Sequence, residues 1–99
     1  MVILNFLNKE TENINYGFVN KKAFKVLPKE LHRKAQIKLA RLNAATSMND
    51  LMELKGNRLE KLLGARKNTF SMRINDQYRI CFKWINDNAL DVEIVDYHS

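Results

Sequence analysis

The strongest constraint on the fold of this chain is the alternation of apolar and polar residues between Phe70 and Tyr97. Side chains of a strand point to opposite sides in turn, so the segments FSMRI, YRICFKW and LDVEIVDY, read as strands, separate into two faces. One face takes Phe70, Met72, Ile74, Tyr78, Ile80, Phe82, Trp84, Leu90, Val92 and Ile94. The other takes Ser71, Arg73, Arg79, Cys81, Lys83, Asp91, Glu93, Val95 and Tyr97. We expect the first face to cover a core, and the second to stay wet and offer a place to hold a phosphate.

The registers of the two hairpins follow from keeping these faces apart. A three-residue loop at 75–77 pairs Ile74 with Tyr78 and Arg73 with Arg79, whereas a two-residue loop would mix the faces. In the second hairpin, opposing Trp84 and Leu90 also aligns Lys83 with Asp91, and an opposite-charge cross-strand pair supports that register.

The residues before position 64 predict mostly helices. The expected elements are a short strand at 2–6, a helix from an Asn8 N-cap to Gly17, a short helix at 21–26, a long helix from Pro28 and a strand at 59–63. The long helix has an apolar stripe of Leu27, Leu31, Ala35, Leu39 and Leu42. Lys29, Arg33, Lys34, Lys38 and Arg41 lie off the stripe, and we expect His32 at the surface. Ser47 is expected to cap a short turn at 49–51. Helices followed by antiparallel strands predict an α+β fold, with the helices on one sheet face.

Composition and charge place limits on the class of protein. Ninety-nine residues predict one domain over 1–99, and 45% hydrophobic residues with one proline and three glycines predict a folded chain. We expect a cytoplasmic protein, because the single cysteine, Cys81, fits a reducing compartment and no segment reads as a signal peptide or a membrane span. Eight Lys/Arg fall in each of residues 21–41 and 55–83, while residues 84–99 have four acids and no Lys/Arg. This distribution indicates a polyanion or an acidic protein as partner, although a basic helix face is often only solvated.

The motifs of several enzyme classes are missing from the sequence. It has no glycine-rich phosphate loop, no paired-cysteine metal motif, no HExxH and nothing like a serine hydrolase elbow. A metal site at Asp91, Glu93 and Asp96 is conceivable, but an acidic strand edge is the more frequent reason for such a cluster. We expect no metal and no cofactor.

Phosphate chemistry on RNA needs no metal, because the 2′-hydroxyl can attack the adjacent phosphodiester. Arg79 and Arg73 could stabilise charge on the phosphorus, since the planar guanidinium suits phosphate. His98 is the natural group to move protons near neutral pH, with Tyr97 and Asp96 beside it. Taken alone, each of these three has a plainer explanation, because a penultimate histidine is often part of a frayed end, Tyr97 could pack at a strand end and Asp96 could simply be solvated.

Three segments of the sequence resemble a known family. GNRLEKLLGARKNTFSMRINDQYRICFKW, the later DVEIVDYH and the helical RKAQIKLARLNAATS are similar to HigB-type toxins of bacterial toxin–antitoxin modules, in the RelE-like superfamily. The resemblance covers most of residues 28–98. It implies a compact α+β fold and a ribosome-dependent endoribonuclease that cuts translated mRNA and arrests growth. It also implies a helix-turn-helix antitoxin of HigA type, which reaches operator DNA and represses the operon.

The resemblance carries over to individual residues. The family's strand arginine falls on Arg79, and its terminal Asp-Tyr-His falls on Asp96, Tyr97 and His98, which strengthens the case for His98. The family's Gly-Asp-Arg segment falls on Gly64-Ala65-Arg66, so Arg66 becomes a candidate for contact with mRNA or rRNA.

One position departs from the family pattern. Many relatives carry Leu-Lys-Gly at this strand end, and aligning GNRLE places that motif on Leu62-Leu63-Gly64, so Leu63 replaces a lysine. The Leu-Lys-Gly at 54–56 lies eight residues too early to be its equivalent. A histidine that some relatives carry three positions before that lysine corresponds to Glu60. Lys61 or Lys67 could substitute, and losing a cation predicts a weaker or altered nuclease.

Three functions remain open from the sequence. The first is an mRNA-cleaving toxin in which Arg79, His98, Tyr97 and Asp96 form the catalytic site, while Lys61, Arg66 and Arg73 hold the RNA backbone. The second is a non-catalytic protein that arrests growth by occupying RNA or the ribosome. The third is an inactive relic that only binds the antitoxin.

Overall fold

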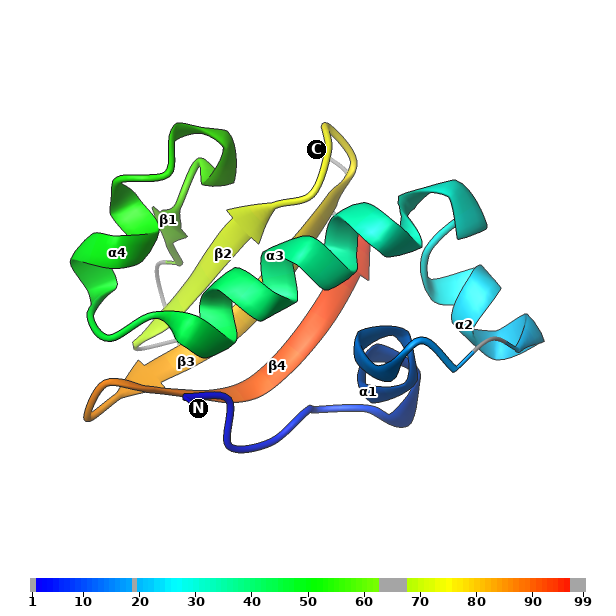
Figure 1. Cartoon of the computed structure of the whole chain (residues 1–99), viewed down its shortest axis with the longest axis horizontal. Coiled ribbons are helices and arrows are strands. Elements are labelled where there is room, and N and C mark those ends of the chain that lie inside the picture. The colour runs from blue at the N-terminus through cyan, green and yellow to red at the C-terminus, as the bar shows by residue number, and fades with distance from the viewer. Residues whose placement is uncertain (1, 19, 63–67, 97–99) are drawn as a thin grey trace.

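The structure of the chain, a computed structural model, describes residues 2–18, 20–62 and 68–96. Its elements are α1 (Lys9–Tyr16), α2 (Lys21–Val26), η1 (Lys29–Leu31), α3 (His32–Ala44), α4 (Met48–Met52), η2 (Lys55–Asn57), β1 (Glu60–Lys61), β2 (Thr69–Arg73), β3 (Tyr78–Ile85) and β4 (Asn88–Asp96). The strands form one antiparallel sheet in the order β1-β2-β3-β4, and α3 crosses one face of it (Figure 1). The predicted α+β fold with helices on one sheet face is confirmed.

The N-terminal segment lies along the edge of β4 but is not a regular strand. Ile3 and Phe6 form two isolated parallel bridges, to Ala89 and Val92. The Leu4 N–H donates to the Ala89 carbonyl at 2.9 Å, so the segment shields part of an edge that would otherwise expose unpaired backbone groups. The strand predicted at 2–6 is therefore reduced to two bridges.

Local sequence signals set the ends of the helices. The Asn8 side chain accepts from the Thr11 N–H at 2.9 Å, and Gly17 ends α1 in the left-handed region at φ 78°, as predicted. The short helix at 21–26 is also confirmed as α2. The helix predicted from Pro28 starts with the single turn η1 and becomes α-helical only at His32. The Asp50 carboxylate accepts from the Ser47 N–H at 3.3 Å, in the capping box of α4.

The core lies between α3 and the sheet. Four of the five predicted stripe residues are fully buried, and Leu31 is partly buried against them. From the sheet, the predicted apolar face supplies Met72, Ile74, Ile80, Phe82, Val92 and Ile94, all of which are buried. The apolar stripe and the alternation of the strands thus meet as one core.

The register of the first hairpin is confirmed and that of the second is wrong near its turn. Arg73 lies opposite Arg79, in the register expected for a loop at 75–77. In the second hairpin, a β-bulge shifts the pairing between Cys81 and Lys83. As a result, Trp84 lies opposite Ala89 rather than Leu90. The predicted ion pair from Lys83 nevertheless forms, because the bulge leaves the Asp91 carboxylate 3.4 Å from its Nζ atom.

The shift also changes which residue covers the core. Ala89 is fully buried, whereas Leu90 pairs with Lys83 and therefore lies on the opposite face from the one predicted. Asp91, next in the chain, adopts φ 51°, a value that strand residues rarely take. A bulge adds one residue to one strand, and this reverses the alternation of side chains between the bulge and the turn.

Two polar residues of α3 are buried, contrary to expectation. The His32 Nε2 atom lies 2.8 Å from the Leu27 carbonyl oxygen, and its ring packs on Phe24 with centroids 5.4 Å apart. Lys38 was expected off the apolar stripe, but its side chain is only 6% exposed. Each is buried because a polar partner meets its polar atom, which hydrophobic periodicity does not reveal.

None of the described helices is long and apolar enough to cross a membrane.

Candidate functional site

The sheet face that carries Arg79 is not wet at its centre. Ser71 and Cys81 are buried, and Arg79 is only 7% exposed. The expectation that this whole face stays in water is therefore wrong at Ser71, Arg79 and Cys81, whereas Lys83 is exposed as expected. An arginine buried to this degree must be hydrogen-bonded, because removing an unpartnered charge from water is strongly unfavourable.

Arg79 obtains those hydrogen bonds from two segments. Its Nε atom donates to the Ser71 Oγ atom at 2.8 Å, and its Nη2 atom donates to the Ser71 carbonyl at 3.2 Å. The Nη2 atom also makes a short hydrogen bond to the carbonyl oxygen of Arg58, which precedes β1. The planar guanidinium is thus held at its Nε and Nη2 atoms, by Ser71 of β2 and by the backbone of the segment before β1.

The residue that accepts this bond has an unusual backbone. Arg58 adopts φ 41°, a left-handed conformation that is unfavourable for a residue with a side chain. Asn57, directly before it, is fully buried and makes side-chain hydrogen bonds to Lys38 and to the Leu51 carbonyl, at 2.8 and 3.2 Å. A strained backbone conformation persists where its surroundings are well fixed, and the hydrogen bonds of Asn57 fix the residue next to Arg58.

Lys38 of α3, the partner of Asn57, is a buried cation. Its Nζ atom donates to Asn57, a neutral partner. Burial lowers the pKa of Lys38 below the ordinary lysine value of 10.5, and the positive charges of Arg41, Lys34 and Arg73 lower it further. Lys38 is thus in contact with Asn57, the residue that precedes Arg58, whose carbonyl oxygen accepts from Arg79.

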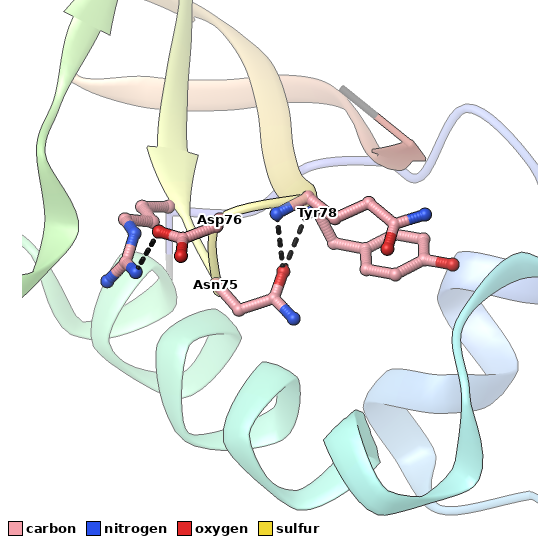
Figure 2. Close-up of polar contacts among 5 residues, drawn as sticks. Asn75, Asp76 and Tyr78 are labelled. Atoms are coloured by element: carbon pink, nitrogen blue, oxygen red, sulfur yellow. Dashed lines mark hydrogen bonds and ion pairs between the residues drawn. The ribbon is translucent and has the colours of Figure 1, made fainter. Parts of the chain in front are cut away.

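The loop between β2 and β3 organises a second arginine. Arg73 donates from Nη2 to the Asp76 carboxylate at 2.6 Å, and this bond holds the pKa of Asp76 below its usual range. Figure 2 shows Asn75, Asp76 and Tyr78 at this loop, where the Asn75 Oδ1 atom accepts from the N–H groups of Gln77 and Tyr78, at 2.9 and 2.8 Å. The two opposed arginines therefore have separate local partners, which reduces the repulsion that the register implies.

The same loop reaches the end of β4. The Gln77 Nε2 atom donates to the Asp96 carboxylate at 3.1 Å. Asp96 is exposed and lies opposite Tyr78, a residue of the core face, so the register places it on the helix side of the sheet rather than beside Arg79. Of the predicted terminal trio, Asp96 is the member that the structure describes, because Tyr97 and His98 lie outside the described residues.

The predicted RNA-binding residues divide between the two faces. Arg73 shares the face of Arg79, because the two lie opposite each other. Lys61 lies opposite Phe70, which packs on the core, so the register places Lys61 on the other face. Glu60 lies opposite Ser71 and takes the Arg79 face. Arg66, together with Leu63 and Lys67, lies outside the described residues.

Within residues 2–18, 20–62 and 68–96, no group of three or more His, Cys, Asp or Glu side chains is placed to hold a metal ion. Two of the acidic residues considered for a metal site, Asp91 and Asp96, have other partners. The Asp91 carboxylate accepts from the Asn5 Nδ2 atom at 2.8 Å and pairs with Lys83. The amide of Asn5 is the main cause that holds the pKa of Asp91 below its usual range.

Sequence reasoning missed the partners that hold Arg79. Ser71 was assigned only to a wet face, Asn57 and Arg58 received no role, and Lys38 was considered only as part of the basic helix that would contact rRNA or an acidic antitoxin. A backbone carbonyl has no signature in the sequence, and Asn57 becomes significant only when η2 brings it against α3. The one available signal was the placement of Ser71 two residues before Arg73 on the arginine face.

Comparisons with known proteins show the family. The model of the RelE-like HigB toxin of type II toxin–antitoxin systems matches residues 3–98. Toxin HigB-1 of Vibrio cholerae is 37% identical over 70 residues, which cover 71% of this chain and 74% of that protein. An uncharacterized protein of Haemophilus influenzae is 33% identical over 73 residues, which cover 74% of this chain and 71% of that protein.

A solved structure supports the fold. The YoeB–YefM complex from Staphylococcus aureus contains a chain that superposes with a TM-score of 0.62 at 21% identity, covering 98% of this chain and 95% of that chain. At this identity the similarity shows the fold alone. Together with the family match, these findings show that the chain belongs to the HigB-like family of RelE-like toxins of type II toxin–antitoxin systems.

Proposed function

We propose that this toxin is a ribosome-dependent endoribonuclease that cuts translated mRNA and thereby inhibits translation and growth. The reaction requires the 2′-hydroxyl of one nucleotide to attack the adjacent phosphodiester, and the protein stabilises negative charge on the phosphate and moves protons. No metal is part of this proposal, because RNA supplies its own nucleophile.

The observation that carries the proposal is the way Arg79 is held. Its guanidinium is buried on the sheet face and bonded to Ser71 and to the Arg58 carbonyl. A donor fixed before the substrate arrives loses little on reorganisation, and in a site with little water its charge is weakly screened. We assign Arg79 to stabilise the developing charge on the phosphate.

The remaining roles follow the family pattern. His98 would transfer protons, Tyr97 would orient or stack on a base, and Asp96 would orient His98. Arg73 shares the face of Arg79 and would hold the RNA backbone there. Arg66 would contact RNA as well. Lys61 would contact RNA that passes over the edge of the sheet at β1.

Leu63 in place of the family lysine favours a mild nuclease. Removing one cation from a phosphate site lowers the stabilisation of the transition state. We therefore expect slower cleavage than in relatives that keep the lysine, and exchanging Leu63 for lysine should raise the rate.

Mapping of mRNA 5′ ends in bacteria after brief induction tests the proposal. We expect new in-frame ends with the wild type, and about 100-fold fewer with Arg79→Ala. Arg79→Lys keeps the charge but loses the planar fork, and should also be strongly impaired. Lys83→Ala is the matched control, because it removes one exposed cation from the same strand. The folded amount of each variant is compared by circular dichroism.

The other outcomes separate the alternatives. Growth arrest by the wild type without new mRNA ends would point to a protein that acts by occupying the ribosome. Absence of arrest, together with tight binding of an antitoxin, would indicate a relic.

We also propose that the partner of this toxin is a helix-turn-helix antitoxin of HigA type, through which the complex would reach operator DNA. The family is one of toxin–antitoxin systems, and the structurally similar chain comes from a complex of YoeB with YefM, so both findings support a toxin that pairs with a second protein. Co-expression with the adjacent reading frame should abolish toxicity and give a complex that co-purifies. Toxicity that persists with every neighbouring frame would contradict this pairing.

A further inference from the structure

Lys38 and Asn57 are two buried polar residues to which the proposed reaction gives no role. Lys38 is 6% exposed on α3, and Asn57 is fully buried at the end of η2. Buried lysines are uncommon, because moving an ammonium group out of water is unfavourable and the side chain must also be ordered. A function for this pair would account for its presence in a core that could otherwise be apolar.

The two residues join three elements at one point. The Lys38 Nζ atom donates to the Asn57 Oδ1 atom at 2.8 Å, and the Asn57 Nδ2 atom donates to the Leu51 carbonyl of α4 at 3.2 Å. The backbone N–H of Asn57 donates to the Leu54 carbonyl at 2.9 Å. Asn57 is thus fixed by its backbone and by both ends of its amide, to α3 on one side and to α4 on the other.

Asn57 directly precedes the residue whose carbonyl oxygen meets Arg79. Arg58 follows it with φ 41°, and its carbonyl oxygen accepts the short hydrogen bond from the Nη2 atom of Arg79. A conformation of this kind persists only where the surrounding structure imposes it. The chain of contacts therefore runs from Lys38 to Asn57, across one peptide bond to Arg58, and on to the guanidinium of Arg79.

From this geometry we propose that Lys38 and Asn57 are positioning residues for Arg79. They hold η2 so that the Arg58 carbonyl sets the angle at which the guanidinium meets the phosphate. This proposal rests on the proposed function, because it gives a role to Arg79 in RNA cleavage. Small displacements of a group that stabilises a transition state lower the rate by up to about 100-fold, so a distant pair of residues can control catalysis.

The test compares two substitutions that remove the same charge from the same helix. Lys38→Met keeps a long apolar side chain but loses the donor to Asn57, whereas Lys34→Met removes an exposed cation one turn away. Cleavage is measured on ribosomes stalled on a defined mRNA, and kcat is obtained separately from the half-saturating ribosome concentration. For Lys38→Met we expect kcat to fall about tenfold or more with little change in half-saturation. For Lys34→Met we expect kcat to be unchanged.

Asn57→Ala is the second variant, and it breaks the same contact from the other side. It should lower kcat per folded molecule as Lys38→Met does. The Arg79 Nε–H signal in the NMR spectrum, which in the wild type reports the hydrogen bond to Ser71, should shift in both variants and not in Lys34→Met. A role in stability alone would change the melting temperature without moving kcat per folded molecule or this signal.

The outcomes distinguish a failure of this inference from a failure of the proposed function. Wild-type kcat per folded molecule in Lys38→Met or Asn57→Ala, with Arg79→Ala inactive, would overturn the positioning role and leave the nuclease assignment intact. Wild-type cleavage by Arg79→Ala would overturn both. Equal losses of kcat in Lys38→Met and Lys34→Met would show that only net charge matters and would also overturn the positioning role.

Discussion

At the centre of β2 and β3, the two faces of the sheet are buried to a similar degree by different interactions. On the helix side, Met72 lies opposite Ile80, and both are fully buried among apolar neighbours. On the other side, Ser71 and Arg79 are almost equally buried, but hydrogen bonds to each other and to the backbone replace apolar packing. The same strands therefore carry a core on one face and a polar site on the other.

This difference predicts which amino-acid substitutions each face tolerates. Apolar packing depends mainly on volume, so substitutions of similar size are accepted with modest loss. A hydrogen-bonded cation depends on the direction of each donor and acceptor, and loss of one partner leaves a polar group buried without compensation. We expect the helix side to govern stability, and the Arg79 side to govern the chemistry.

The largest effect on stability is expected for Ile80→Ala. Deleting the buried side chain should lower the free energy of unfolding by about 2–5 kcal/mol, through lost transfer free energy and the cavity left behind. Urea denaturation measures this loss, and Ile80→Val, with an expected loss of about 0.5–1.5 kcal/mol, is the graded control. Cleavage per folded molecule should stay at the wild-type level in Ile80→Val. A large loss of kcat in that variant would show that the two faces are not functionally separate.

A smaller loss of stability, with a larger loss of activity, is expected for Ser71→Ala. The substitution removes the Oγ atom that accepts from Arg79 at 2.8 Å and leaves that donor buried. The expected loss of stability is about 1–3 kcal/mol. Because the guanidinium also loses its orientation, kcat should fall more than in Ile80→Val at comparable stability. Equal cleavage rates in these two variants would contradict the division between the faces.

Much of the fold could be predicted because its signals are local and periodic. The alternation in β2 and β3, the 75–77 loop and the Asn8 cap all depend on neighbours within a few residues. The prediction failed at the second hairpin because the bulge near Asp91 breaks a period of two, and nothing in the residue pattern marked that break. Leu90 was consequently assigned to the wrong face.

The site could be predicted only in part, for a different reason. Arg79 and its face follow from alternation and from the family pattern, but the burial of that face follows from tertiary contacts. The hydrogen bond from Arg79 to the Arg58 carbonyl joins residues 21 positions apart, and that from Lys38 to Asn57 joins residues 19 apart. Charge patterns suggested that Lys38 was solvated, since most lysines are.

Lys38 is a buried charge whose hydrogen-bond acceptor, Asn57, is neutral. The smallest expected effect is that of its titration on the free energy of unfolding. Its pKa in the folded protein lies below the ordinary value of 10.5, with burial as the main cause. Between these two pKa values the unfolded chain binds more protons than the folded protein, so the free energy of unfolding should rise with pH across that window. At pH values below this window, the free energy of unfolding is lowered by the full unfavourable effect of burying the ammonium group.

The Lys38→Met variant isolates this effect from the other groups that titrate at alkaline pH. Urea denaturation of the wild type and the variant, repeated from neutral pH to about 10.5, gives the difference in the free energy of unfolding. The difference should change in favour of the wild type as pH rises, because only the wild type loses a buried charge. Lys34→Met removes an exposed lysine of the same helix, whose charge is a smaller cause of the lowered pKa of Lys38, so it should change the pH dependence much less than Lys38→Met does. A curve for Lys38→Met parallel to that of the wild type would show that the ammonium group is hydrated in the folded protein, and that the packing around Lys38 and Asn57 is looser than their hydrogen bonds indicate.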